Sequence, residues 1–272
     1  MDENHPLNRV LIPRKITDGL PLVKYGETFA YNPVTISQFA LTRFSQGQND
    51  AVLIAANKLL SMQRKDGAFP YEFSYKHMLN LRPYKPGWIS GMAQGQSLSA
   101  LGRAYTISHD KRFLDAGNKA LAFLQMPFPK GPMADLSDLD PSLSGYSFIL
   151  EYPVKPHAYT LNGYLFAVIG LYDWWKITGS EDAHRLFDDA VRTLIKLVSY
   201  YDIGTASTYD IGYITQAISQ PYLEPSPPYI NAGYQGFHAE LLAVMFDITG
   251  NPIFDEYSKR FTNQFWNEIS AN

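Results

Sequence analysis

The sequence predicts an all-α fold, an (α/α) toroid built from repeated helical hairpins, with a short irregular or β-containing segment at its N-terminus. Two observations favour this fold. Amphipathic helical patterns occur in pairs, and the similar turns YTISHD, WKITGS and FDITGN end the first helix of three successive pairs. Repeated helical hairpins imply a solenoid or a closed ring. Long loops enter between the pairs, which favours a closed or partly closed ring with a cleft at one end.

We expect two parts of the chain. Residues 1–45 form an irregular or extended segment, and residues 46–272 form a single toroid domain that contains the helices. Apolar residues three and four positions apart indicate amphipathic helices. Such patterns occur at Gln48–Gln63, Ser90–Ser108, Lys111–Gln125, Thr160–Thr178, Glu181–Tyr201, Tyr234–Thr249 and Ile253–Glu268. Two stretches rich in Pro lack this period, so we expect a loop or short strands at Met126–Pro156 and a loop at Asp202–Gly233. Loops of this length in compact domains often carry function.

The first helices of the pairs are polar for helices that would line the inside of a ring. Gln94 and Gln96 stand beside Gly95, and Asn162 precedes Gly163. Either the small residues allow tight helix packing, or the amides face a polar cleft. The sequence leaves both interpretations open.

Composition and charge exclude several classes of protein. The 23 basic and 26 acidic residues give a net charge of −3, so neither a nucleic-acid-binding surface nor a membrane-binding surface is expected. There is no cysteine, which excludes disulfides and cysteine metal sites. The first residues, MDENHPLNRVLIPRK, contain no long apolar run, so we expect no signal peptide and no membrane anchor. This leaves the cytoplasm, or a compartment reached through a targeting segment that this sequence lacks.

The residue types suit a sugar-binding cleft that uses neither a metal nor a cofactor. Aromatic residues reach 14%, with 19 Tyr, a side chain that stacks on a sugar ring and hydrogen-bonds through its hydroxyl. The six His show no HExxH motif and no paired ligand spacing, so no catalytic zinc is expected. No GxGxxG motif follows a strand, so no nicotinamide cofactor is expected. Calcium bound by loop carboxylates such as Asp135, Asp138 and Asp140 is left open.

Four segments of the chain resemble the glucuronyl C5-epimerase family. The rare string MAQGQ stands in the first, an EYP block followed by a helix beginning LNG in the second, two Tyr-Asp pairs in the third and a Tyr-His block in the fourth. Their order and spacing agree with the family across roughly residues 60–265. The four segments are Trp88–Gln96, Glu151–Trp174, Tyr200–Ile211 and Gly233–Leu242.

The resemblance implies a toroid domain that removes the C5 proton of a D-glucuronyl residue and returns a proton to the opposite face, giving an L-iduronyl residue. The implied partner is an acidic polysaccharide of the heparosan type, and the resemblance also implies a homodimer. Carried over position by position, the implied proton carriers are Glu151, Tyr152, Tyr209 and Tyr234. His238 matches a histidine of the last block and is expected to contact the substrate, whereas Gly212 stands where the animal enzymes have a substrate-binding arginine.

This chemistry needs two proton carriers on opposite faces of the sugar ring, because the C5 hydrogen lies beside a carboxylate and is weakly acidic. Glu151 suits the base, since burial among aromatic residues would raise its pKa toward neutrality. Tyr234 is the first candidate for the proton donor and Tyr209 the second. Three further kinds of contact are predicted. The candidate cations for the substrate carboxylate are Arg82, Arg103 and Lys155. The candidate rings for stacking on sugars are Trp88 and Tyr84, and the candidate amides facing the cleft are Gln94, Gln96 and Asn162.

Two other interpretations fit the same residues. A polysaccharide lyase or an unsaturated-uronyl hydrolase on this fold would also act on uronates, and a lyase begins with the same C5 proton abstraction. A hydrolase would need two carboxylates flanking a bond, whereas only Glu151 is well placed by motif. The remaining alternative is a toroid that binds carbohydrate without catalysis.

Overall fold

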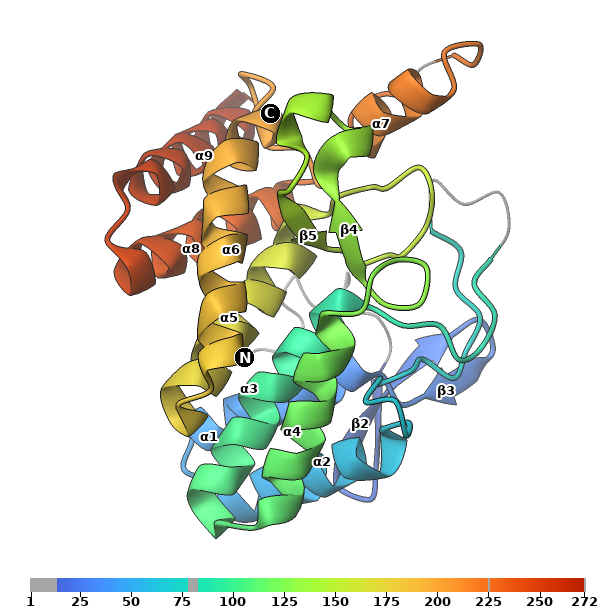
Figure 1. Ribbon diagram of the computed structural model, residues 1–272, viewed down its shortest axis with the longest axis vertical. Coiled ribbons are helices and arrows are strands. Elements are labelled where there is room, and N and C mark those ends of the chain that lie inside the picture. The colour runs from blue at the N-terminus through green and yellow to red at the C-terminus, as the bar shows by residue number, and fades with distance from the viewer. Residues whose placement is uncertain (1–13, 78–82, 225, 272) are drawn as a thin grey trace.

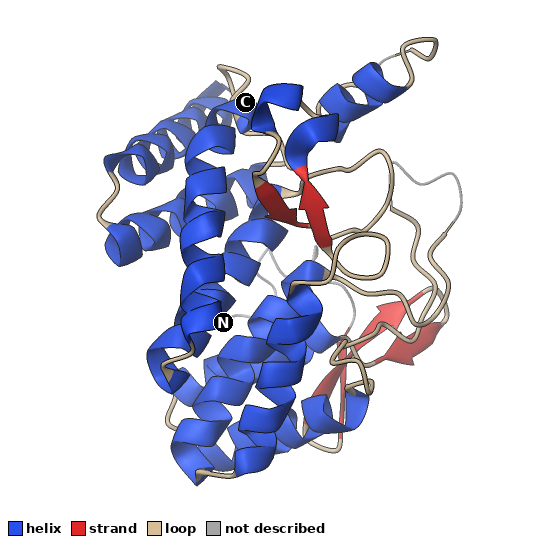
Figure 2. Ribbon diagram, viewed as in Figure 1, coloured by secondary structure: helices blue, strands red, loops and turns tan. Residues whose placement is uncertain are grey.

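The computed structural model describes residues 14–77, 83–224 and 226–271. Helical hairpins dominate these residues (Figures 1 and 2). The hairpins are α1 (Pro33–Ser45) with α2 (Asn49–Met62), α3 (Gly91–Ser108) with α4 (Lys111–Leu124), α5 (Leu161–Thr178) with α6 (Glu181–Leu197), and α8 (Ala232–Thr249) with α9 (Pro252–Ala271).

The first helices of the hairpins form an inner layer, in which α1 packs on α3, α3 on α5 and α5 on α8. Each second helix packs outside its own first helix. This arrangement confirms the predicted (α/α) toroid. The inner helices α1 and α8 form the two ends of the row, so the predicted helical pairs correspond to real hairpins in the predicted order.

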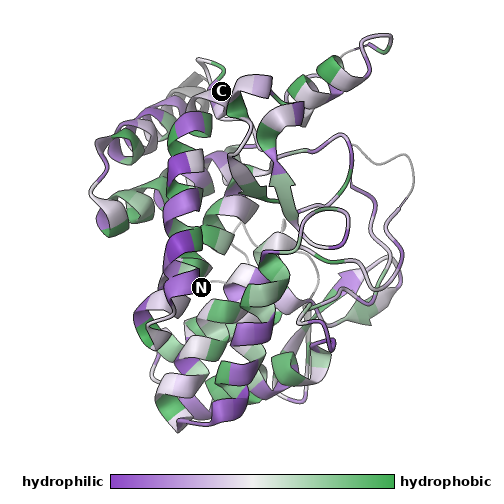
Figure 3. Ribbon diagram, in the orientation of Figure 1, coloured by the Kyte–Doolittle hydropathy of each residue, from purple (hydrophilic) through white to green (hydrophobic). Residues whose placement is uncertain are grey.

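Burial follows from position in the two layers. The outer helix α6 buries one stripe, which includes Phe187 and Leu194, and turns its charged residues to solvent, as Figure 3 shows along its length. The inner helix α3 is buried on nearly every side over its first three turns, because neighbours cover it all round. In the described part of the chain, no helix is long and apolar enough to span a membrane.

Two glycines bring the inner helices α3 and α5 into backbone contact. A Cβ atom at Gly95 would lie 2.3 Å from the Cα of Ala167, and one at Gly170 would lie 2.0 Å from the carbonyl oxygen of Gly95. These atoms belong to helix backbones and cannot rotate away. At this crossing the small residues therefore serve tight packing, one of the two interpretations that the sequence left open.

We expect Gly170→Ala to lower the free energy of unfolding by roughly 1–3 kcal/mol, because the added methyl group forces α3 and α5 apart. Chemical denaturation followed by circular dichroism measures this change. Gly236→Ala in α8 is the matched control, since no atom lies within 4 Å of the Cβ it adds. Equal stability of the two variants would contradict the packing argument.

The N-terminal part of the described chain is an antiparallel sheet of β1 (Arg14–Thr17), β2 (Leu20–Tyr25) and β3 (Thr28–Ala30). This sheet agrees with the β-containing segment that was expected. The expectation that the chain is irregular up to residue 45 was wrong for α1. The helix start is encoded by Asn32, whose side chain accepts a hydrogen bond from the Thr35 amide, and by Pro33 at the first helical position.

The two long stretches without a helical period differ in structure. Within residues 126–156, β4 (Met133–Asp135) pairs with β5 (Ser147–Ile149), so the short strands expected there are present. Within residues 202–233, the expected loop was wrong for α7 (Gly212–Ser219), the short helix at the upper right of Figure 1. Eight residues span little more than two turns, too few to display an amphipathic period.

Candidate active site

A cleft of about 440 Å³ lies at the N-terminal ends of the inner helices. Each inner helix contributes residues from its start to the lining of this cleft. The cleft is therefore a product of the toroid, which brings four helix starts to one end of the ring. These residues are Asn32, Val34 and Gln38 at α1, Ser90 and Met92 at α3, Asn162 and Phe166 at α5, and Tyr234 and Phe237 at α8.

One side of the cleft is an aromatic wall made of Tyr25, Tyr71, Phe73, Tyr75 and Trp88. Tyr71 stacks on Trp88 with ring centroids 4.0 Å apart, and Tyr25 of β2 stacks on Phe73 at 3.6 Å. The Trp88 indole donates a hydrogen bond of 3.0 Å to the Phe73 carbonyl. The rings are thus fixed before any ligand arrives, and such surfaces stack on the apolar faces of sugars.

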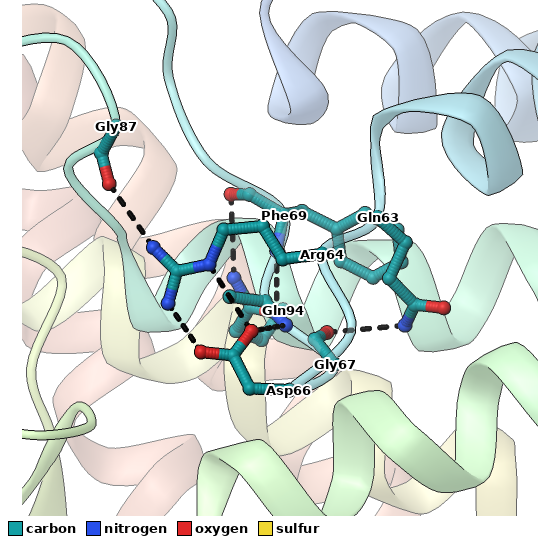
Figure 4. Close-up of polar contacts among 8 residues, drawn as sticks. Gln63, Arg64, Asp66, Gly67, Phe69, Gly87 and Gln94 are labelled. Atoms are coloured by element: carbon teal, nitrogen blue, oxygen red, sulfur yellow. Dashed lines mark hydrogen bonds and ion pairs between the residues drawn. The ribbon is translucent and has the colours of Figure 1, made fainter.

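The segment between α2 and α3, which carries most of this wall, is held by polar contacts to α3 and by polar contacts within the segment (Figure 4). Gln94 of α3 accepts a hydrogen bond from the Phe69 amide at 3.2 Å. Arg64 pairs with Asp66 and donates to the Gly87 carbonyl at 3.4 Å. Gln94 is fully buried in this contact, so its predicted role in substrate binding is replaced by a role in holding the wall.

Glu151 is the one carboxyl group among the described residues that line the cleft. It is 7% exposed, and its Oε2 has no hydrogen-bond partner among the described residues. Burial raises the pKa of Glu151 from its ordinary 4.5 to about 7; Tyr152 lowers this pKa and the charge of Asp210 raises it further. A carboxyl group with a pKa near neutrality can take up a proton and release it again.

The place of the Glu151 carboxyl depends on a glycine in the first turn of α5. A Cβ atom at Gly163 would lie 2.1 Å from Glu151 Oε2 and 2.6 Å from its Cδ. The absence of a side chain at Gly163 therefore leaves the space that the carboxyl group occupies. Gly163 thus serves the cleft, whereas Gly95 serves helix packing.

Three tyrosines gather beside Glu151. The hydroxyl groups of Tyr152 and Tyr209 are 3.3 Å apart, and the ring centroids of Tyr209 and Tyr234 are 4.3 Å apart. Removal from water raises the pKa of all three, and the negative charge of Glu151 raises each further. At neutral pH these phenols are therefore protonated and able to donate a proton.

The structure brings most of the predicted catalytic and stacking residues together. Tyr209 lies against two of them without lining the cleft itself, and Tyr84 stacks on Trp88 with centroids 5.1 Å apart. The predicted residues that line the cleft are Glu151, Tyr152, Tyr234, Trp88 and Asn162.

Other predicted contacts lie away from the cleft lining. Gln96 is buried within α3, and His238 is fully buried in α8 with its Nδ1 3.0 Å from the Ser207 hydroxyl. Burial lowers the pKa of His238 to about 3, so this imidazole is neutral. Both side chains lie in the interior of the protein and do not reach the cleft lining.

The structure does not bring the described candidates for a substrate-binding cation to the cleft. Arg103 lies in the second half of α3, where its guanidinium is 2.7 Å from the Asp173 carboxylate. Lys155 is exposed, and its ammonium lies 6.0 Å from the centroid of Phe128. Arg82 lies outside the described residues. Among the described residues that line the cleft, none is a lysine or an arginine.

Tyr71, Phe73 and Tyr75 were missed by sequence reasoning, although a signal was present. Phe69, Tyr71, Phe73 and Tyr75 alternate with other residues, a period of two that puts them on one face of an extended segment. Tyr25 gave no comparable signal, because its place in the wall depends on contacts between distant segments.

The loop carboxylates considered for calcium have other partners. Asp135 accepts hydrogen bonds from the amides of Ser137 and Gly145, and Asp140 accepts one from Ser142. Asp138 accepts a hydrogen bond from the Tyr159 hydroxyl. Over residues 14–77, 83–224 and 226–271, no group of three or more His, Cys, Asp or Glu is placed to hold a metal ion.

Comparison with known proteins agrees with this architecture. A family model described as the D-glucuronyl C5-epimerase C-terminus matches residues 63–263. The D-glucuronyl C5-epimerase of Caenorhabditis elegans is 26% identical over 242 residues, which are 84% of this chain and 37% of that protein. The chain thus spans little more than a third of that relative.

Two solved structures share the fold. A polysaccharide lyase superposes with a TM-score of 0.54 at 13% identity, covering 91% of this chain and 63% of that one. A sugar epimerase from a ruminal bacterium superposes with a TM-score of 0.52 at 14% identity, covering 90% of this chain and 62% of that one. At these identities the likeness shows the fold alone.

Proposed function

Because the chain belongs to the D-glucuronyl C5-epimerase C-terminal family, we propose that it inverts C5 of D-glucuronyl residues in a polysaccharide, giving L-iduronyl residues. The observation that carries the proposal is the pairing of Glu151 with protonated tyrosines in one aromatic cleft. A base near neutrality and phenols that keep their protons are the two kinds of group that this inversion requires.

The proposed reaction moves one proton off C5 and another onto it. Glu151 takes the C5 proton, and the electron pair of the broken C–H bond moves into the adjoining carboxyl group. A tyrosine hydroxyl, with Tyr234 as the first candidate, then donates its proton to C5 from the other face of the ring. The hydroxyl groups of Tyr152 and Tyr209, 3.3 Å apart, offer a path by which the protonation states are restored.

The aromatic wall supports a sugar chain as the substrate. Tyr71, Tyr75 and Trp88 stack on one another along one side of the cleft, so consecutive sugar rings find flat surfaces there. Neutral donors take the place of a cation among the described lining residues, which include the Asn162 amide and several tyrosine hydroxyls. Hydrogen bonds from such groups stabilise the charge that develops on the sugar carboxyl group.

Proton exchange at C5 tests the proposal. The protein is incubated with a heparosan-type glucuronan in deuterated water, and NMR follows deuterium entry at C5 and the appearance of iduronyl signals. We expect both. A folded protein that exchanges no C5 proton on several uronate polymers would contradict the proposal, and a new ultraviolet absorbance from an unsaturated uronate would identify a lyase instead.

We expect Tyr234→Phe to reduce the exchange rate by roughly a hundredfold or more, because the donor hydroxyl is lost while the ring contact with Tyr209 is kept. The same NMR assay measures the rate. Tyr257→Phe, on the outer helix α9, is the matched control. An unchanged rate in Tyr234→Phe would assign the donor to another tyrosine.

A further inference from the structure

Asp210 is a second buried carboxyl group that the proposed reaction leaves without a role. It is 4% exposed, and its Oδ1 accepts a hydrogen bond of 3.0 Å from the Gly212 amide. Its Oδ2 is buried and has no hydrogen-bond partner among the described residues. A buried carboxyl group with one oxygen lacking a hydrogen bond destabilises a fold. Its presence beside the site therefore indicates a role other than stability.

Backbone hydrogen bonds hold the segment of Asp210 against the chain that enters α5. The Leu161 amide donates to the Tyr209 carbonyl at 3.1 Å, and the Ile211 amide donates to the Ala158 carbonyl at 3.0 Å. Asp210 lies between these two bonds. The Glu151 carboxyl group rests on Gly163 in the first turn of the same helix, so both acids surround one helix start.

We infer that Asp210 is a positioning residue of the site, a second buried carboxyl group that acts through Glu151 and does not touch the sugar. The inference rests on the proposed function. Two like charges in a region shielded from water disfavour each other's ionisation. After burial, which has the largest effect, the charge of Asp210 raises the pKa of Glu151. Glu151 thereby becomes a stronger base toward the C5 hydrogen.

The two acids differ in pKa, and the tyrosines around them keep their protons at neutral pH. Burial raises the pKa of Asp210 to about 6, below that of Glu151. Tyr201 and Tyr213 face Asp210, whose charge raises the pKa of each after the larger effect of burial. Asp210 therefore ionises before Glu151, so its charge is present while Glu151 titrates. The hydroxyl groups that face Glu151 belong to Tyr71, Tyr75, Tyr152, Tyr209 and Tyr234.

Asp210→Asn separates the charge of this side chain from its structural role, since the amide oxygen can still accept the Gly212 hydrogen bond. We expect the Glu151 titration midpoint to move to lower pH by about half a unit or more. The acid limb of the exchange rate should move with it. Asp210→Glu keeps the charge and should keep the midpoint. Asp140→Asn is the matched control, because Asp140 also caps a turn but is exposed to solvent.

Carbon-13 NMR of carboxyl-labelled protein measures the midpoint without substrate, with Glu151→Gln identifying the Glu151 signal. Failure of the proposed function would appear as a lack of C5 exchange in the wild-type protein, while this titration would still test the inference. An unmoved Glu151 midpoint in folded Asp210→Asn overturns the inference. If that variant does not fold, the wild-type curve decides: a Glu151 signal with a second inflection shared with Asp210 supports the coupling, and a single inflection overturns it.

Discussion

Replacing Glu151 by Gln is expected to lower the rate of C5 proton exchange by roughly a thousandfold, because a positioned base contributes about 10²–10⁴ to such a transfer. Glutamine keeps the shape that fits over Gly163 but cannot take up a proton. Exchange into a glucuronan in deuterated water, followed by NMR, measures the loss. A Glu151→Gln variant with a rate near that of the wild-type protein would remove Glu151 from the reaction.

The pH dependence of the wild-type protein provides a second measurement of the same group. Glu151 acts as a base only when it is ionised, and its pKa is raised to about 7, so exchange should increase as pH rises through about 7.

The raised pKa of Glu151 also affects stability. Between pH 4.5 and about 7 the folded protein holds a proton that the unfolded chain has released, so the free energy of unfolding falls as pH rises through this range. Glu151→Gln should therefore be at least as stable as the wild-type protein at neutral pH, which excludes unfolding as the cause of lost activity.

Gly163→Ala is expected to lower the exchange rate by roughly a hundredfold, the cost of misplacing a catalytic group by about 1 Å. The added methyl group would lie 2.1 Å from Glu151 Oε2, so the carboxyl group must move out of its place. The loss should appear in kcat more than in KM, because the aromatic wall, the proposed sugar-binding surface, is untouched. Initial rates at several polysaccharide concentrations separate the two constants.

Gly236→Ala is again the matched control, since it places alanine in an inner helix near the cleft where nothing lies within 4 Å of the new Cβ. Its rate should equal that of the wild-type protein. If Gly163→Ala also kept the wild-type rate, the position of the Glu151 carboxyl group would not depend on Gly163, and the base would have to reach the sugar from another place.

Periodicity alone predicted the hairpins well, because amphipathic helices of three or more turns repeat their apolar residues visibly. The helix α4, with Phe113, Ala116 and Ala120 on one face, is such a case. It did not predict α1, since the start of that helix is encoded by the Asn32 cap and Pro33 more than by a period. Nor could it predict α7, which is short and lies among turns.

The site was predictable where residues are adjacent in sequence or share a motif, as for Glu151 and Tyr152. Arg103 shows why the remainder was not. Arg103 was expected to contact the substrate carboxylate, and it shares a helix face with Gln96, from which seven residues separate it. The cleft is formed by helix ends, and seven residues advance about 10 Å along a helix axis. Sharing a face therefore does not place two residues at the same end of the ring.

The convergence of four helix starts on the cleft has an electrostatic consequence. Each helix carries a macrodipole with about half a positive charge at its N-terminus, where backbone amides lack partners within the helix. In α1, α3, α5 and α8 these positive ends lie together beside Asn32, Met92, Asn162 and Tyr234. An anionic group in the cleft can thus be attracted by the backbone itself. Peptide dipoles do not titrate, so this attraction persists at pH values at which a lysine would lose its charge.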